Sequence, residues 1–392
     1  MVFEWTAPAR IVFGRGAAAG IGRLAAEIGR RVLFIRAGAL PATSGTVEAV
    51  RVALAAEGLE FLEAEARGEP EVEAVDALTA RVRPFEPDVI LGLGGGSAID
   101  TAKAVAGLLA GGGEVLDYLE VIGRGRPFGR PGVPVIAVPT TAGTGAEATR
   151  NAVLASRAFG VKASLRGPAL VPRLAVVDPA LTDTLPPAVT ASTGLDALTQ
   201  CLESYLALNS RPWTDALALE GLNRAARSLV PAFRGGSAPE ARDDMALAAL
   251  LSGLCLTNAG LGAVHGLAAA LGGKFPIPHG VACGRVLPGV LSENVRAMTA
   301  GGAGRPVPAK CLRLADVFLP AGRGSEKTRT AALGDRLSAL VEELEIPRLS
   351  AFGVTEADLP ALAEAAGRSR SIRQNPVALA EKTLRDILRA AL

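Results

Sequence analysis

Histidine is scarce in this chain, where only His265 and His279 occur among 392 residues. Aromatic residues make up 4% of the chain, and neither sign of charge is in clear excess, with 41 Lys plus Arg against 39 Asp plus Glu. A chain without a basic excess lacks the electrostatic signature of a nucleic-acid-binding protein. No apolar run reaches the roughly 18 residues that a membrane-spanning helix needs. We therefore expect neither nucleic acid nor a membrane among its partners.

Cysteine is also rare, and its spacing argues against two kinds of site. The four residues lie far apart without a C-x-x-C pair, at Cys201, Cys255, Cys283 and Cys311. This spacing argues against a disulfide framework and against an all-cysteine zinc site. The first residues, "MVFEWTAPARIVFG", lack the basic segment and apolar run of a secretory signal. We expect a soluble, cytoplasmic protein in a reducing compartment.

The pattern of apolar residues changes about halfway along the chain. The first half alternates short apolar runs, at 31–36, 88–96 and 133–141, with helical patterns at 75–85 and 98–110. Continuous apolar runs between helices indicate parallel strands that are covered on both faces. The second half carries apolar residues at i, i+3, i+4 and i+7 in long Ala- and Leu-rich segments. We predict a Rossmann-like α/β domain over residues 1–186 and an all-helical domain over residues 187–392.

Two glycine-rich motifs follow predicted strands of the first half. "LGLGGGSAIDTAK" places Gly94, Gly95, Gly96 and Ser97 between a strand and a helix. Glycines let the backbone approach a pyrophosphate, and free N–H groups at a helix start favour its negative charge. "VPTTAGTGAEAT" offers the hydroxyl groups of Thr140, Thr141 and Thr144, which suit the ribose and nicotinamide end of the same dinucleotide. A tight turn without any ligand is the alternative for each motif alone.

Three further residues, Asp196, His265 and His279, form a candidate metal site. Asp196 and Gln200 are four residues apart in a predicted helix and so share one face, although an Asp there also fits the first turn of a helix. His265 and His279 lie fourteen residues apart in one glycine-rich segment, and each alone also fits a buried core position. One carboxylate and two imidazoles form the three-ligand open set of a catalytic divalent metal.

Taken together, these motifs resemble the iron-containing (group III) alcohol dehydrogenase family over essentially the whole chain. The matching segments are "GLGGGSAIDTAK", "VPTTAGTGAEATRNAV", "LAVVDPALTDTLPP", "TGLDALTQCLESY", "HGLAAALGGKFPIPHG" and "SIRQNPVAL". The resemblance implies an N-terminal dinucleotide-binding domain, a C-terminal helical metal-binding domain, NAD(P), a divalent metal and a homodimer. It implies cofactor contacts at Gly94, Gly95, Gly96, Ser97, Asp100, Thr140, Thr141, Thr144 and Lys162. It implies metal ligands at Asp196, His265 and His279, with Gln200 at the position of a fourth, histidine ligand.

The chain departs from the family pattern at three positions. Gln200 is a poorer ligand than imidazole, so zinc is nearly as well supported as the family's iron, because related glycerol dehydrogenases look as if they hold zinc with one Asp and two His. Ala269 replaces a histidine that many members carry, so a proton relay there is absent. Ala37 replaces an acid that favours NAD, and Arg36 beside it slightly favours NADP over NAD, unless Arg36 points to solvent.

The resemblance implies a metal-dependent, NAD(P)-linked alcohol dehydrogenase that reduces aldehydes or ketones in reverse, with Asp196, His265 and His279 as its catalytic residues. Three alternatives stay open. A maleylacetate reductase or another oxo-acid reductase would need additional cations, for which Arg150, Lys162 and Lys274 are candidates. A metal-dependent lyase similar to dehydroquinate synthase has the same architecture. A non-catalytic homologue is the third alternative, because of Gln200.

Overall fold

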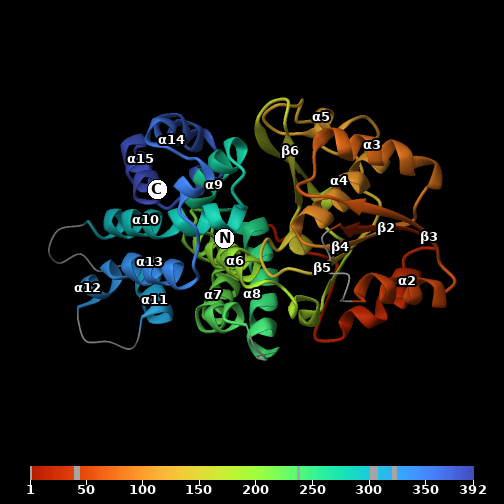
Figure 1. The fold of residues 1–392 in the computed structure, drawn as a ribbon, viewed down its shortest axis with the longest axis horizontal. Helices are drawn as coiled ribbons and strands as arrows, with labels where there is room; N and C mark the ends of the chain where they lie inside the picture. Colours follow the sequence, from red (N-terminus) through yellow and green to blue (C-terminus); the bar gives the residue numbers. More distant parts are fainter. Residues whose placement is uncertain (1, 39–44, 236–238, 301–307, 320–324) are drawn as a thin grey trace. The chain divides into compact units, whose positions relative to one another are not determined.

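The computed structural model describes residues 2–38, 45–235, 239–300, 308–319 and 325–392. The chain divides into two compact units, Met1–Leu185 and Pro186–Leu392. The first unit is α/β and the second is helical (Figure 1). Among the described residues, no single helix is long and apolar enough to cross a membrane; α8 (Pro239–Ala259) and α9 (Ala263–Lys274) pass that test only together, as a pair bent by 101°.

The first unit is built on a parallel sheet with the strand order β1-β8-β5-β4-β2-β3. Its strands are β1 (Arg10–Phe13), β2 (Arg31–Ala37), β3 (Glu60–Ala66), β4 (Val89–Gly94), β5 (Val135–Pro139) and β8 (Leu174–Val177). Its α-helices are α1 (Ile21–Ala26), α2 (Thr46–Ala56), α3 (Val72–Val82), α4 (Gly96–Gly111) and α5 (Val115–Tyr118). A separate antiparallel pair consists of β6 (Asn151–Ser156) and β7 (Val161–Arg166).

Two apolar cores lie on opposite faces of this sheet. Alternate residues of β2 belong to different cores: Leu33 and Ile35 pack with α3 and α4, whereas Val32 and Phe34 pack with α1 and α2. Figure 1 shows α3 and α4 on one side of the sheet and α2 on the other. Burial on both faces is the reason why these strands read as continuous apolar runs.

In its described residues, the second unit is built from helices. They are α6 (Pro187–Leu206), α7 (Pro212–Phe233), α8 (Pro239–Ala259), α9 (Ala263–Lys274), α10 (His279–Thr299), α11 (Ala309–Phe318), α12 (Glu326–Ala331), α13 (Leu333–Glu343), α14 (Leu359–Arg368) and α15 (Glu381–Ala390). Short 3₁₀ turns complete both units: η1 (Ala17–Gly20), η3 (Arg83–Phe85), η4 (Ala146–Ala148), η5 (Pro168–Leu170), η6 (Pro179–Thr182), η7 (Leu349–Phe352), η8 (Glu356–Asp358) and η9 (Ser371–Gln374). The predicted fold class, a parallel α/β part followed by an all-helical part, is confirmed.

Helix α10 packs unusually close to α6 because of two glycines. A Cβ atom added to Gly280 would lie 1.9 Å from the backbone oxygen of Ser192, and one added to Gly284 would lie 2.7 Å from Cδ1 of Leu195. No side chain larger than hydrogen fits at Gly280 without a shift of α6 or α10. This close packing brings His279 and Cys283, which directly precede the two glycines, next to α6.

Candidate functional site

His265 presents a buried and unpaired ring nitrogen. The residue is the third of α9, and its Nδ1 lies 2.7 Å from Oε2 of Glu203, a buried carboxylate on α6. A carboxylate at this distance accepts a hydrogen bond from Nδ1–H, so the lone pair of the neutral ring lies on Nε2. This Nε2 has no hydrogen-bond partner among the described residues, although it lies 3.4 Å from Oδ1 of Asp196. A buried nitrogen with a free lone pair has the properties of a metal ligand.

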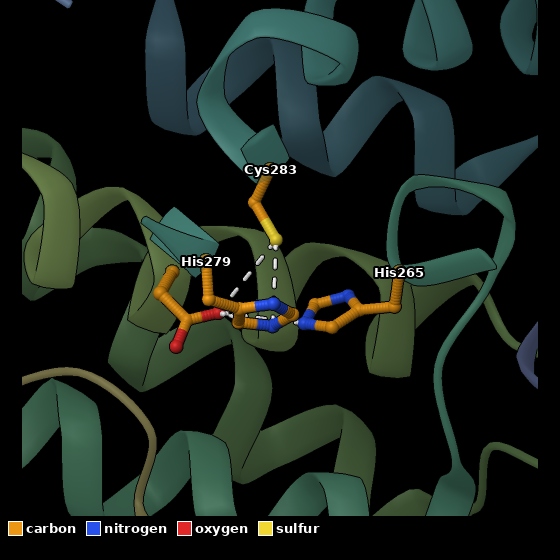
Figure 2. A group of neighbouring side chains, drawn as sticks. His265, His279 and Cys283 are labelled. Carbon is orange, nitrogen blue, oxygen red and sulfur yellow. Dashed lines mark hydrogen bonds and ion pairs between the residues drawn. The ribbon is translucent and has the colours of Figure 1, made fainter. Parts of the chain in front are cut away.

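Asp196 is the centre of a cluster of potential ligands. Its Oδ1 lies 3.4 Å from His265 Nε2, 3.7 Å from His279 Nε2 and 3.9 Å from Cys283 Sγ. One ligand atom from each of these four residues lies within 4.8 Å of each of the others. A tetrahedral metal with bonds of about 2.0–2.3 Å separates its ligand atoms by roughly 3.3–3.6 Å. The spacing therefore fits a single divalent ion, and Figure 2 shows the three labelled side chains converging.

The pKa values in this cluster favour charged forms. Burial raises the pKa of Asp196, but the positive charge of His279 and the contact with His265 lower it below the usual range. Burial also raises the pKa of the Cys283 thiol, and the charges of both histidines outweigh that effect and lower it. Burial by itself lowers the pKa of His265, whereas Cys283 and Asp196 raise it well above its usual range. A divalent cation satisfies the same negative groups without these protons.

Gln200 lies one turn after Asp196 and is buried beside it. Its Oε1 lies 3.2 Å from Oγ of Ser252 on α8, and a hydrogen bond from the Gln200 side chain contributes to the low pKa of Asp196. The amide group of Gln200 thus contacts both Ser252 and Asp196. In this arrangement the amide supports Asp196, and a role of Gln200 as a fourth metal ligand stays a prediction.

The sequence reasoning missed two residues of this site. Glu203 shares a face of α6 with Asp196 and Gln200, at i+7 and i+3, and Cys283 lies one turn after His279 on α10. The signal for both was their spacing: each lies on the same helix face as a residue that the sequence analysis had named, Asp196 for Glu203 and His279 for Cys283. Glu203 also accepts hydrogen bonds from the backbone N–H groups of Val264, at 2.6 Å, and of His265, at 3.4 Å, and so fixes the start of α9.

The two glycine-rich motifs of the first unit meet at neighbouring strand ends. Thr140 donates its backbone N–H to the carbonyl oxygen of Gly94 at 2.9 Å. Cβ atoms added to Gly95 and Gly96 would lie 3.3 Å from the side chain of Thr141 and 2.9 Å from that of Thr144.

Helix α4 begins at Gly96, so Ser97 is its second residue. Its N-cap residue is Gly95, which has no side chain that could cap the helix. The first N–H groups of this helix are therefore suited to an anion.

Asp100 and Lys103 form a buried pair on α4. Asp100 Oδ2 accepts a hydrogen bond from the backbone of Val153 at 3.0 Å, and its Oδ1 lies 3.4 Å from Lys103 Nζ. Lys103 is fully buried and donates to Thr149 Oγ1 at 2.7 Å. Burial raises the pKa of Asp100 and lowers that of Lys103. Both side chains are used to attach α4 to the segment before β6 and to β6 itself.

Two other cations singled out in the sequence are paired with carboxylates. Lys162, on β7, donates to Glu69. Arg36, on β2, donates through Nε to Glu63 at 2.6 Å and through a terminal nitrogen to Glu65 at 3.0 Å. Arg36 therefore does not point freely to solvent, and its charge is balanced by two carboxylates of β3.

Comparison with known proteins identifies the family. Residues 8–179 match the model of iron-containing alcohol dehydrogenases, and residues 190–392 match the C-terminal model of the same family. A long-chain-alcohol dehydrogenase of Geobacillus thermodenitrificans is 37% identical over 82% of this chain and 80% of its own length. An NAD-dependent methanol dehydrogenase of Bacillus methanolicus is 31% identical over 98% of both chains.

A solved structure agrees with these matches. The crystal structure of a 1,3-propanediol oxidoreductase superposes with a TM-score of 0.92 and 31% identity, and the match covers 100% of both chains. The family predicted from the sequence motifs is thus confirmed, and with it the enzyme class of oxidoreductase. The chain belongs to the iron-containing alcohol dehydrogenase family.

Proposed function

We propose that the chain catalyses the reversible oxidation of a primary or secondary alcohol to an aldehyde or ketone, with NAD(P) and a divalent metal. The observation that carries this proposal is the unpaired Nε2 of His265. It is buried 3.4 Å from Oδ1 of Asp196, in a cluster whose ligand atoms are spaced as around a single metal ion. When bound, the metal would polarise the substrate oxygen and the nicotinamide would exchange hydride at C4. A buried carboxylate and imidazole without such a cation would leave a nitrogen unsatisfied.

Each residue of the cluster has a distinct role in this proposal. Asp196, His265 and His279 hold the metal. Glu203 holds the proton of His265 on Nδ1, so that Nε2 is available as a ligand. Gln200 positions the carboxylate of Asp196. Because the chain has only two histidines and both are ligands, proton exchange uses water, a ribose hydroxyl group of the cofactor or another side chain.

The cofactor contacts are proposed at the meeting point of the two glycine-rich motifs. The backbone N–H groups of Gly95, Gly96 and Ser97 would bind the pyrophosphate, and Gly94 lets the chain turn there at φ 153°. The remaining proposed contacts are Thr140, Thr141, Thr144, Asp100 and Lys162. Asp100 acts through its buried hydrogen bonds, as a residue that positions α4.

We propose that NAD is preferred over NADP, which revises the expectation drawn from Arg36. The 2'-phosphate of NADP needs a free cation beside β2, whereas Arg36 is already paired with Glu63 and Glu65. A phosphate there would have to displace Glu63 and Glu65 from Arg36, and both carboxylates also pair with other cations, Arg51 and Arg67. The ratio of kcat/KM for NADPH and NADH measures this preference.

The oxo-acid reductase alternative is less well supported, because two of its three candidate cations are paired with carboxylates. Lys274 is paired with Asp358, as Lys162 is with Glu69. A dicarboxylate substrate would have to displace these partners. An uncharged alcohol or carbonyl substrate requires no such exchange.

The test is a substrate panel with protein whose metal content has been measured. We expect oxidation of NADH with aldehydes or ketones in the Zn²⁺- or Fe²⁺-loaded protein, and loss of both metal and activity in His265→Ala. His265→Ala with unchanged metal and activity would refute the ligand assignment, and full metal loading without turnover on any alcohol, aldehyde or ketone would refute the function. Light scattering of the same sample tests the proposed homodimer.

A further inference from the structure

We infer that Cys283 is a fourth protein ligand of the metal, an inference that rests on the proposed function. Its Sγ lies 3.7 Å from Nε2 of His279 and 3.9 Å from Oδ1 of Asp196. Figure 2 shows the thiol directed toward the ring of His279. A tetrahedral ion with bonds of about 2.3 and 2.0 Å separates a sulfur ligand from a nitrogen or oxygen ligand by about 3.5 Å.

The position of Cys283 on α10 leaves its thiol facing the cluster. His279 is the first residue of α10 and Cys283 the fifth, so both lie on one face, and Cys283 is fully buried. Two other cysteines of the same unit face backbone carbonyl oxygens instead: Cys201 lies 3.8 Å from that of Ala248, and Cys255 lies 3.5 Å from that of Thr214. Cys283 is therefore distinguished by its neighbours, which are potential ligands.

Gln200 and Cys283 are complementary in this arrangement. The amide oxygen of Gln200 lies beside Ser252, so α6 supplies Asp196 as its ligand. Cys283 of α10 then completes a set of four protein ligands, and a substrate oxygen would add as a fifth ligand, an expansion that catalytic zinc sites allow. A carboxylate and a thiolate together balance the two positive charges of the metal, and the imidazoles are neutral.

A thiolate in the ligand set has a consequence for the choice of metal. Thiolate is a soft ligand that zinc accepts readily, whereas a mononuclear Fe²⁺ site in proteins is more often built from imidazole and carboxylate. The set of one carboxylate, two imidazoles and one thiolate therefore favours Zn²⁺ over Fe²⁺.

The test is X-ray absorption at the zinc edge on the full-length, Zn²⁺-loaded protein. We expect one sulfur neighbour at about 2.3 Å in the wild type, and only nitrogen and oxygen neighbours at about 2.0–2.1 Å in Cys283→Ser. Cys255→Ser, which replaces an equally buried thiol outside the cluster, is the matched control and keeps the sulfur signal. Wild-type protein that binds zinc and turns over substrate without a sulfur neighbour would overturn the inference and leave the proposed function standing. Wild-type protein that binds neither zinc nor iron would overturn both.

Competition with a chelator gives a second readout, which does not depend on activity. Cys283→Ser should weaken Zn²⁺ binding on the order of tenfold or more, and Cys255→Ser should not change it. Adding Gln200→His to Cys283→Ser should recover part of the loss, because an imidazole then replaces the missing ligand. Equal affinities of the wild type and of a folded Cys283→Ser protein would contradict the inference.

Discussion

His265 is held by Glu203 through a 2.7 Å contact between Nδ1 and Oε2, in which both side chains are buried. This contact decides which ring nitrogen carries the proton. Since Nδ1 keeps its proton beside a carboxylate, the lone pair of Nε2 points toward the cluster around Asp196. The metal affinity of the site thus depends on a residue that does not touch the metal.

The first prediction concerns Glu203→Gln. The amide group allows an N–H to face Nδ1, which moves the ring proton to Nε2 and points it into the cluster. We expect metal affinity to fall about 10–100-fold while the helical content is retained. Chelator competition and circular dichroism measure these two quantities. An unchanged affinity would mean that Glu203 only fixes the start of α9.

The second prediction concerns the close approach of α10 to α6. Gly280→Ala places a Cβ 1.9 Å from the backbone oxygen of Ser192, which cannot rotate away. We expect loss of bound metal and destabilisation by about 1–3 kcal/mol or more, although every ligand residue is still present. Gly284→Ala is the matched control, because its Cβ meets only the flexible end of Leu195. Equal metal contents in both variants would contradict the packing argument.

The third prediction concerns the choice of cofactor. Glu63→Gln combined with Glu65→Gln frees Arg36 for a 2'-phosphate. One charge-assisted hydrogen bond contributes about 1.5–3 kcal/mol, so the ratio of kcat/KM for NADPH over NADH should rise on the order of tenfold or more. Adding Arg36→Ala should cancel the gain. A ratio that stays constant in the double variant would show that Arg36 does not contact the cofactor.

The fourth prediction concerns stability against pH. Burial raises the pKa of Glu147 from 4.5 to about 7 in the folded chain. The folded state therefore binds the proton more tightly than the unfolded state, and stability falls as the pH rises from about 4.5 to 7. The loss amounts to roughly 3 kcal/mol at about 1.4 kcal/mol for each pH unit. Thermal unfolding should show a smaller decline in Glu147→Gln than in the wild type, by about this amount; parallel profiles would exclude Glu147 as a source.

The fold was predictable because its signals are local. The apolar runs of β2, β4 and β5 are continuous since both faces of the sheet are covered, and that pattern is visible without any contact information. The meeting of Gly94 with Thr140 was likewise foreseeable in outline. The carboxyl ends of parallel strands share one edge of a sheet, and β4 and β5 are neighbours.

The missing parts of the site depend on contacts between distant segments. Cys283 and Glu203 are single polar residues on apolar helices, and only the packing of α9 and α10 against α6 gives them partners. Arg36 was expected to bear a free charge because the β2–β3 register, in which Arg36 lies opposite Glu65, cannot be read from either strand alone. The contact of Gln200 with Ser252 could not be foreseen, because Ser252 is distant in the sequence.

The most direct test of the central claim, that Asp196, His265 and His279 hold one divalent metal, is anomalous scattering at the metal edge from crystals of the loaded protein. The account predicts a single strong peak within about 2.0–2.3 Å of Asp196 Oδ1, His265 Nε2 and His279 Nε2. A fully loaded protein whose anomalous peak lies away from these three atoms would contradict it.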